Sequence, residues 1–264
     1  MSVARKFKTR PNPPHLPITV RQVRRFDEDG YLLIPALFDS DFVNAVSAQI
    51  DQLIDIAATL EESTSISGTD FVLGGRSCEP LRIDRIVGAG GCAPVLGFLG
   101  KDKRLTDTVR LLLDALELEQ IINQVHLKLP GDEVAFDWHQ DSLHRRYGTP
   151  VWRDVLGNGS FVQTLVAIDK MTETNGPIKV IPGSHRSGHL AVDAERRLNP
   201  TLVDTKRARV LTMNPGDALF IGPFTIHGSS PNRTCQPRRL FINGFCAQGA
   251  NRRIYPYLGK GQSV

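Results

Sequence analysis

The sequence of 264 residues has few cysteines and no long apolar run. Its four cysteines, Cys78, Cys92, Cys235 and Cys246, form no CxxC pair. This spacing argues against a zinc knuckle, and we expect free thiols, as in proteins of the reducing cytoplasm. No stretch approaches the roughly 20 apolar residues that a membrane-spanning helix needs. The basic N-terminus lacks the apolar core of a secretory signal, and the C-terminal GKGQSV is no peroxisomal address. We therefore expect a cytoplasmic protein with no membrane partner.

The body of the chain also lacks an excess of either charge. The formal net charge is +4, and Arg5, Lys6, Lys8 and Arg10 lie in residues 1–16, which contain no acid. The other 28 basic residues are balanced by 28 acidic ones. We predict that residues 1–16 form a disordered basic tail. Because a basic patch with interleaved aromatic residues is missing, we expect no nucleic-acid partner.

The first part of the remaining chain has helical patterns. Residues 17–29 predict a short helix that ends near Gly30 and is followed by an apolar strand. Apolar residues recur at helical spacing over 40–63, with Ser40 and Asp41 as candidate caps. The Gly- and Ser-rich residues 64–80 predict a loop, and residues 92–116 predict further helix.

From about residue 119 the pattern changes to short extended runs separated by turn signals such as NPGD and SPN. Strands at this spacing favour a β-barrel or β-sandwich. No internal repeat is present. We therefore predict one domain over residues 17–264, mainly β with flanking helices. Its helical part covers about 17–118 and its β core about 119–248.

A candidate metal site begins in the stretch DWHQDS, residues 137–142. His139 and Asp141 are two residues apart, so their side chains share one face only if the segment is extended. The five-residue gap from His139 to His144, with no Glu after His139, excludes the helical HExxH zinc site. A third ligand must come from elsewhere, and His227, at the end of the apolar run FIGPFTIHG, is the best placed. Two histidines and one carboxylate are typical of non-haem Fe(II) oxygenases.

Two arginines follow His227 after a Ser-Pro-Asn turn and a returning strand. A planar guanidinium is a natural bidentate partner for a carboxylate. Arg238 and Arg239 must point to opposite faces of that strand, so only one of them can lie beside the metal. The alternation does not say which.

The motifs WHQD, NGPIKVIPGSHRSGH, PGDALFI and HGSSPN, followed by Arg238, resemble the phytanoyl-CoA dioxygenase family over roughly residues 20–248. The resemblance implies a double-stranded β-helix, a jelly-roll and cupin-like core, with Fe(II) and O2 as cofactors and 2-oxoglutarate as cosubstrate. It implies an enzyme, most often a hydroxylase, that oxidises a C–H bond of a small molecule and releases succinate and CO2. The site residues it implies are His139, Asp141 and His227 for iron and Arg238 for 2-oxoglutarate, with Gln140, Ser229 and Lys128 as further cosubstrate candidates.

The presence of Asp141 distinguishes the chain from related halogenases, in which a small residue replaces this carboxylate. Hydroxylation is therefore favoured over halogenation. Two alternatives stay open: a cupin-type metal enzyme that uses no 2-oxoglutarate and so has no need for Arg238, and a catalytically inactive barrel that binds a small ligand.

The substrate-binding residues are expected in the long connection of residues 142–159, since loops of this length often line active sites. Its candidates for holding an anionic or ring-bearing substrate are Arg145, Arg146, Tyr147 and Trp152, beside His144. Arg82, with Arg85, is a second candidate wall. The expected partner is a small molecule that carries negative charge, and the sequence is silent on oligomeric state.

Overall fold

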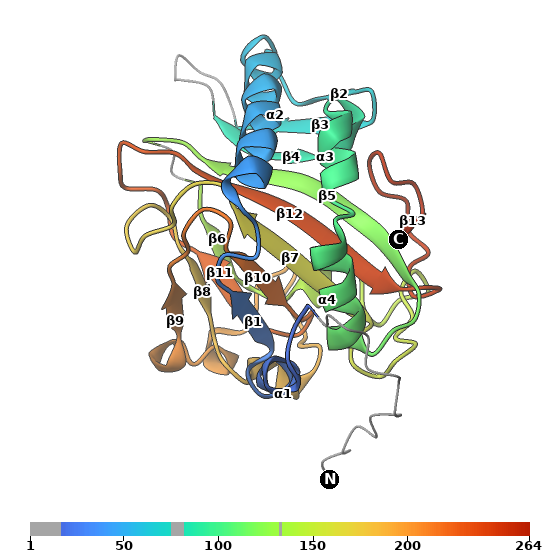
Figure 1. Ribbon diagram of the computed structural model, residues 1–264. Helices are drawn as coiled ribbons and strands as arrows, with labels where there is room; N and C mark the ends of the chain where they lie inside the picture. The colour runs from blue at the N-terminus through green and yellow to red at the C-terminus, as the bar shows by residue number, and fades with distance from the viewer. Residues whose placement is uncertain (1–16, 75–81, 132–133) are drawn as a thin grey trace.

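Two antiparallel β-sheets form the centre of the fold (Figure 1). The structure is a computed structural model, and it describes residues 17–74, 82–131 and 134–264; the predicted tail 1–16 lies outside the described residues. The α-helices are α1 Val20–Asp29, α2 Ser40–Ala58, α3 Pro94–Leu99, α4 Lys103–Leu113 and α5 Asp141–His144. The strands are β1 Tyr31–Ile34, β2 Thr64–Ile66, β3 Thr69–Leu73, β4 Ile83–Val87, β5 Leu118–Lys128, β6 Phe136–His139, β7 Phe161–Ala167, β8 Ile178–Val180, β9 Arg209–Leu211, β10 Ala218–Ile221, β11 His227–Ser229, β12 Arg238–Ala247 and β13 Gln262–Ser263.

The larger sheet has the strand order β1-β10-β7-β12-β5-β4-β3-β2, with β13 added to β5. The smaller sheet has the order β6-β11-β8-β9. Helices α2, α3 and α4 lie against one face of the larger sheet, as Figure 1 shows. Its other face packs against the smaller sheet through a second apolar cluster that includes Leu165, Ile178 and Leu240. The jelly-roll prediction is confirmed.

Because both faces of the larger sheet are covered, its central strands are apolar nearly throughout. All seven residues of β7 are buried, as are nine of the ten residues of β12. Alternation within β12 still decides the environment of each side chain. Phe241 and Phe245 pack under the helices, and Leu240 and Ile242 face the smaller sheet.

The helix ends follow ordinary capping chemistry, with one correction. Thr19 and Gln22 form a capping box at the start of α1, and Gly30 ends the helix at φ +83°. The cap of α2 is Asp39, whose carboxylate accepts a hydrogen bond from the Phe42 N–H, and not Ser40 or Asp41 as predicted. Asp39 comes one residue earlier than the apolar periodicity suggested, because the cap itself stands outside that period.

The N-terminal part is less purely helical than predicted. Residues 64–66 and 69–73 form β2 and β3, which extend the larger sheet, so the predicted loop is wrong for these residues. Ser67 and Gly68 make a tight turn with positive φ, and this turn chemistry gave the stretch its loop-like composition. The predicted helix at 92–116 is two helices, α3 and α4, separated around Gly100–Asp102.

Two smaller expectations concern the cysteines and the membrane. Cys92, Cys235 and Cys246 are free thiols as predicted, and Cys78 lies outside the described residues. In the described parts of the chain, no helix combines the length and apolarity needed to cross a bilayer.

Candidate active site

The site lies in a cavity of about 670 Å³ between the two sheets. Its floor is the inner face of the larger sheet, and strands β6, β8 and β11 form the opposite wall. The register places Gln124, Leu165 and Ile242 in one row across the floor. The size is typical of pockets that hold small organic ligands.

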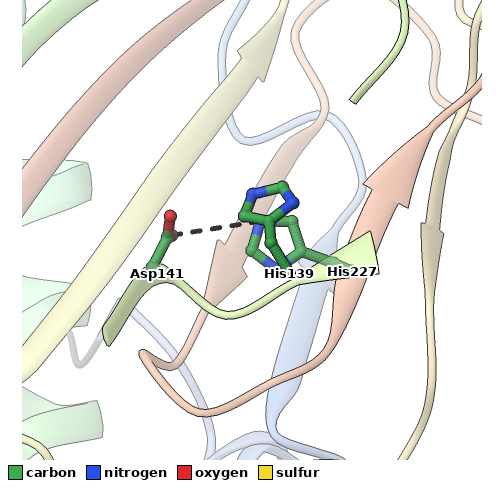
Figure 2. A group of neighbouring side chains, drawn as sticks. All are labelled: His139, Asp141 and His227. Atoms are coloured by element: carbon green, nitrogen blue, oxygen red, sulfur yellow. Dashed lines mark ion pairs between the residues drawn. The ribbon is translucent and has the colours of Figure 1, made fainter. Parts of the chain in front are cut away.

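His139, Asp141 and His227 meet at one point of this cavity (Figure 2). His139 ends β6 and pairs directly with His227 at the start of β11, so the two rings lie 4.3 Å apart between centroids. Asp141 comes from the first turn of α5, with its Oδ2 4.0 Å from His227 Nε2. The predicted extended segment therefore reaches Gln140, and Asp141 itself begins a helix. Within the described ranges, these three residues are the one group of histidine, cysteine and acidic side chains arranged to hold a metal ion.

Backbone carbonyls orient both imidazoles. His139 Nδ1 lies 2.7 Å from Asp137 O, and His227 Nδ1 lies 2.9 Å from Thr225 O. A carbonyl oxygen only accepts, so each Nδ1 carries the proton and each Nε2 presents a lone pair. Burial lowers the pKa of His139 to about 3, so this ring is neutral at neutral pH. Both rings are therefore ready to coordinate a cation.

Asp141 completes a donor set that fits a divalent metal ion. Burial raises the pKa of this carboxyl group, but electrostatic interactions with His227, His139 and Arg145 outweigh burial and lower the pKa overall. The buried Oδ2 has no hydrogen-bond partner in the structure. An ionised, buried oxygen without a donor is costly unless a cation faces it. Two nitrogens and one oxygen are the ligand set that suits non-haem Fe(II).

Arg238, at the start of β12, is the second charged feature of the cavity. Its side chain is only 1% exposed, and Nε and Nη1 have no hydrogen-bond partner. Burial lowers the pKa of Arg238 to about 9, against an opposing effect of Asp169, so the guanidinium is still charged at neutral pH. A buried guanidinium with two free donors fits a carboxylate ligand.

Lys128 and Ser229 lie beside Arg238. Lys128 pairs with Arg238 across β5 and β12, so both side chains point to the same face. Lys128 Nζ donates to Ser229 Oγ at 2.8 Å and to Ser230 O. Ser229 lines the cavity. The structure thus brings together Arg238, Ser229 and Lys128, which are three of the residues predicted to bind the cosubstrate.

Gln140 lies elsewhere, and its predicted contact with the cosubstrate needs correction. Its Nε2 donates to Gly188 O at 2.9 Å and to Phe224 O, and its Oε1 accepts from the Leu190 N–H at 2.8 Å. The side chain is 1% exposed and does not line the cavity. Its polar atoms hold two loops against the metal-binding segment.

The predicted substrate residues separate into two groups. Arg145 is buried and lines the cavity, and His144 lies beside it. Tyr147 and Trp152 instead pack on each other, 5.7 Å between ring centroids, outside the cavity lining. The tight turn that follows α5 directs Tyr147 towards Phe224 and the carbonyl of Gly159.

The other two predicted substrate residues, Arg146 and Arg82, also lie outside the cavity lining. Arg146 has φ +56° and points into solvent, because the chain turns sharply after Arg145. Arg82 is exposed and donates to Asp84 at 2.9 Å, whereas Arg85 lines the cavity. Arg82 precedes β4, whereas Arg85 lies within the strand.

Several cavity residues were missed by the sequence argument. His126 lines the floor, stacks on Phe136 at 5.1 Å and has no partner for its buried Nε2. Arg253 and Tyr255 reach the cavity from the C-terminal segment. For His126, period-two spacing from Lys128 in β5 was a usable signal. For the C-terminal pair no sequence signal existed, because both residues lie in the irregular segment between β12 and β13.

Comparison with known proteins agrees with this geometry. The family model described as phytanoyl-CoA dioxygenase matches residues 26–240. The ectoine dioxygenase of Sphingopyxis alaskensis is 31% identical over 268 residues, covering 91% of this chain and 79% of that protein. The methylphosphonate hydroxylase of Gimesia maris is 38% identical over 142 residues, covering 53% and 50%. The solved structure of EctD from S. alaskensis with 2-oxoglutarate and 5-hydroxyectoine superposes with a TM-score of 0.68 at 26% identity, covering 93% of this chain and 81% of that one.

The chain belongs to the phytanoyl-CoA dioxygenase family. With the donor set of His139, Asp141 and His227, it is an Fe(II)- and 2-oxoglutarate-dependent dioxygenase that uses O2 and acts on a small molecule. The class predicted from the sequence is confirmed.

Proposed function

We propose that this dioxygenase hydroxylates a C–H bond of a small anionic molecule, with His139, Asp141 and His227 as iron ligands and Arg238 as the partner of 2-oxoglutarate. The observation that carries the proposal is the buried Arg238 guanidinium, whose Nε and Nη1 have no partner, in the same cavity as the triad. A metal enzyme that used no keto acid would gain nothing from such a cation and would bear the cost of burying it.

Some cavity residues would bind the iron and 2-oxoglutarate, and others exclude water from the reacting centre. His139, Asp141 and His227 would hold the iron ion, which would supply the oxidation chemistry when bound. Arg238 holds the far carboxylate of 2-oxoglutarate, and Ser229 with Lys128 extends that polar end. Asp141 fills the carboxylate position, which supports hydroxylation over halogenation. Apolar side chains of the floor, among them Leu165 and Leu240, keep water from the reacting centre.

The charge of the cavity supports an anionic substrate. Besides Arg238, five arginines line it: Arg85, Arg145, Arg196, Arg197 and Arg253. Fewer acids do so once Asp141 is set aside: Asp70, Asp137 and Glu195. Among the relatives, the protein named methylphosphonate hydroxylase is named for an anionic compound.

The test is an anaerobic titration of metal-free protein with Fe(II) and then 2-oxoglutarate. We expect the weak visible charge-transfer band of an iron-chelated keto acid in the wild type. The band should be lost in His139→Ala and should need at least 10-fold more 2-oxoglutarate in Arg238→Met. Iron binding with no band at any 2-oxoglutarate concentration would favour the metal enzyme that uses no keto acid.

A further inference from the structure

Arg145 is a buried cation that the proposed iron and 2-oxoglutarate sites do not use. Its side chain is 8% exposed, it lines the cavity, and its Nε has no hydrogen-bond partner. Across the described residues, no carboxylate lies within ion-pair distance of its guanidinium. Among the described residues, its guanidinium makes one hydrogen bond, from Nη1 to the Tyr255 hydroxyl, at 3.1 Å. A buried guanidinium held only by a neutral partner is poised for an anion.

Arg145 and Arg238 serve different ends of the cavity. The Arg145 guanidinium lies 5.1 Å from the centre of the Phe161 ring. Phe161 pairs with Cys246, which is eight residues along β12 from Arg238. Eight residues of strand span roughly 27 Å, so the backbone next to Phe161 lies at the other end of β12 from Arg238. Because Arg238 is the proposed partner of 2-oxoglutarate, Arg145 is left for a different anion.

Two C-terminal residues hold Arg145 in place. The Tyr255 ring lies close to two guanidinium groups, 5.2 Å from that of Arg145 and 5.3 Å from that of Arg253. Arg253 Nη1 also donates to the carbonyl of His144, at 3.1 Å. The C-terminal segment therefore contacts His144, the last residue of α5, and Arg145, which caps this helix. Both C-terminal residues lie beyond residue 240, where the family match ends.

We propose that Arg145, Tyr255 and Arg253 form the subsite that receives the oxyanion of the primary substrate. This inference rests on the proposed function, and it makes the segment 251–258 the determinant of which anion fits. The ligand chemistry is a carboxylate or phosphonate group on a compact molecule.

The compactness follows from the position of helix α5. Asp141 and Arg145 lie one helical turn apart, joined by a hydrogen bond from Arg145 N to Asp141 O at 3.0 Å. The iron ligand and the anion-binding side chain are therefore carried by the same turn. The oxidised carbon must lie within a few bonds of the anionic group.

The test uses the enzyme loaded with Fe(II) and 2-oxoglutarate under anaerobic conditions. Calorimetry would measure the binding of acetate, L-proline and methylphosphonate, each beside a counterpart that lacks the anionic group: acetamide, L-prolinamide and dimethyl methylphosphonate. The variants are Arg145→Gln, Arg145→Lys, Arg253→Gln and Tyr255→Phe. The control is Arg252→Gln, an exposed arginine next to Arg253 that does not line the cavity.

We expect at least one anion to bind 10-fold or more tightly than its counterpart. Arg145→Gln should remove that preference, Arg145→Lys should restore part of it, and Arg253→Gln and Tyr255→Phe should weaken anion binding about 3-fold or more. Arg252→Gln should bind as the wild type does. The charge-transfer band should persist in every variant, which shows that each one is folded and that the proposed function stands. Equal binding of anions and counterparts by the wild type, no anion binding at all, or an unchanged preference in Arg145→Gln would overturn the subsite while leaving the iron and 2-oxoglutarate sites intact.

Discussion

Arg238 and Arg239 are neighbours in β12 and point to opposite faces of the same sheet. Arg238 lies in the cavity with Nε and Nη1 unpartnered. Arg239 lies on the other face, where Nε and Nη2 donate to the carboxylate of Asp169 at 2.9 and 2.8 Å and Nη1 donates to Asp51 at 2.5 Å. One guanidinium is therefore neutralised by the protein itself, and the other is left for a ligand.

Arg238→Met should stabilise the ligand-free protein. Met fills similar apolar volume without a buried charge, so we expect the free energy of unfolding to rise by about 1 kcal/mol or more. At 100 times the wild-type dissociation constant, 2-oxoglutarate should stabilise the wild type by about 2.7 kcal/mol and the variant, which binds it at least 10-fold more weakly, by about 1.4 kcal/mol or less. Denaturant unfolding of the iron-loaded protein with and without 2-oxoglutarate measures both effects. A variant that 2-oxoglutarate stabilised as much as the wild type would contradict the role of Arg238.

Arg239→Met should give the reverse result. It leaves Asp169 with fewer partners at a site where the arginine side chain is 14% exposed, so we expect a loss of about 1–3 kcal/mol in stability. The affinity for 2-oxoglutarate should stay within about 2-fold of the wild type. Urea midpoints and the charge-transfer titration would be measured on the same preparations. Equal effects of the two substitutions would mean that the faces of β12 are assigned wrongly.

His227→Ala should abolish tight iron binding while the barrel stays folded. The histidine lies on β11 and its Nδ1 bonds only a backbone carbonyl, so the sheet keeps its register without the ring. We expect iron affinity to fall at least 100-fold, measured by metal content after dialysis. His144→Ala is the control, because this ring lies 5.5 Å from His139 but is not part of the donor set. Loss of iron in both variants would point to a different ligand set.

The sequence alone predicted the donor set because period-two spacing and family motifs both depend on local chain geometry. Strand alternation alone could not decide whether Arg238 or Arg239 faces the cavity. The choice depends on Asp169, which binds Arg239 and lies 70 residues earlier in the chain. The sequence argument also assigned too many residues of the connection after Asp141 to the substrate-binding cavity. Trp152 and Tyr147 became packing residues because long-range contacts with Phe161 and Phe224 bury them. Arg253 and Tyr255 could not be predicted, because an irregular C-terminal segment positions them.

Gln140→Ala should destabilise the fold and spare cosubstrate affinity. The substitution leaves the carbonyls of Gly188 and Phe224 and the N–H of Leu190 without their partner. Three lost hydrogen bonds at a buried position predict a loss of about 2–4 kcal/mol in the free energy of unfolding. The 2-oxoglutarate concentration at half-maximal charge-transfer absorbance should change less than 3-fold. A loss of cosubstrate affinity with unchanged stability would restore the role that the sequence had suggested for Gln140.

His126 should make the ligand-free protein less stable in mild acid. Burial, reinforced by the positive charges of Arg238 and Arg85, lowers the pKa of His126 to about 3 from its usual 6.5. Between these two values the unfolded chain binds a proton that the folded chain does not, so stability is complete above pH 6.5 and falls as the pH drops towards 3. From pH 7 to pH 5.5 this one group predicts a loss of about 1 kcal/mol. His126→Phe keeps a ring against Phe136, and His126→Gln keeps a polar group, yet neither titrates. Urea unfolding at both pH values should therefore show a smaller pH dependence in both variants than in the wild type. The same pH dependence in all three proteins would mean that His126 takes up its proton equally in the folded and unfolded states, so that burial does not lower its pKa.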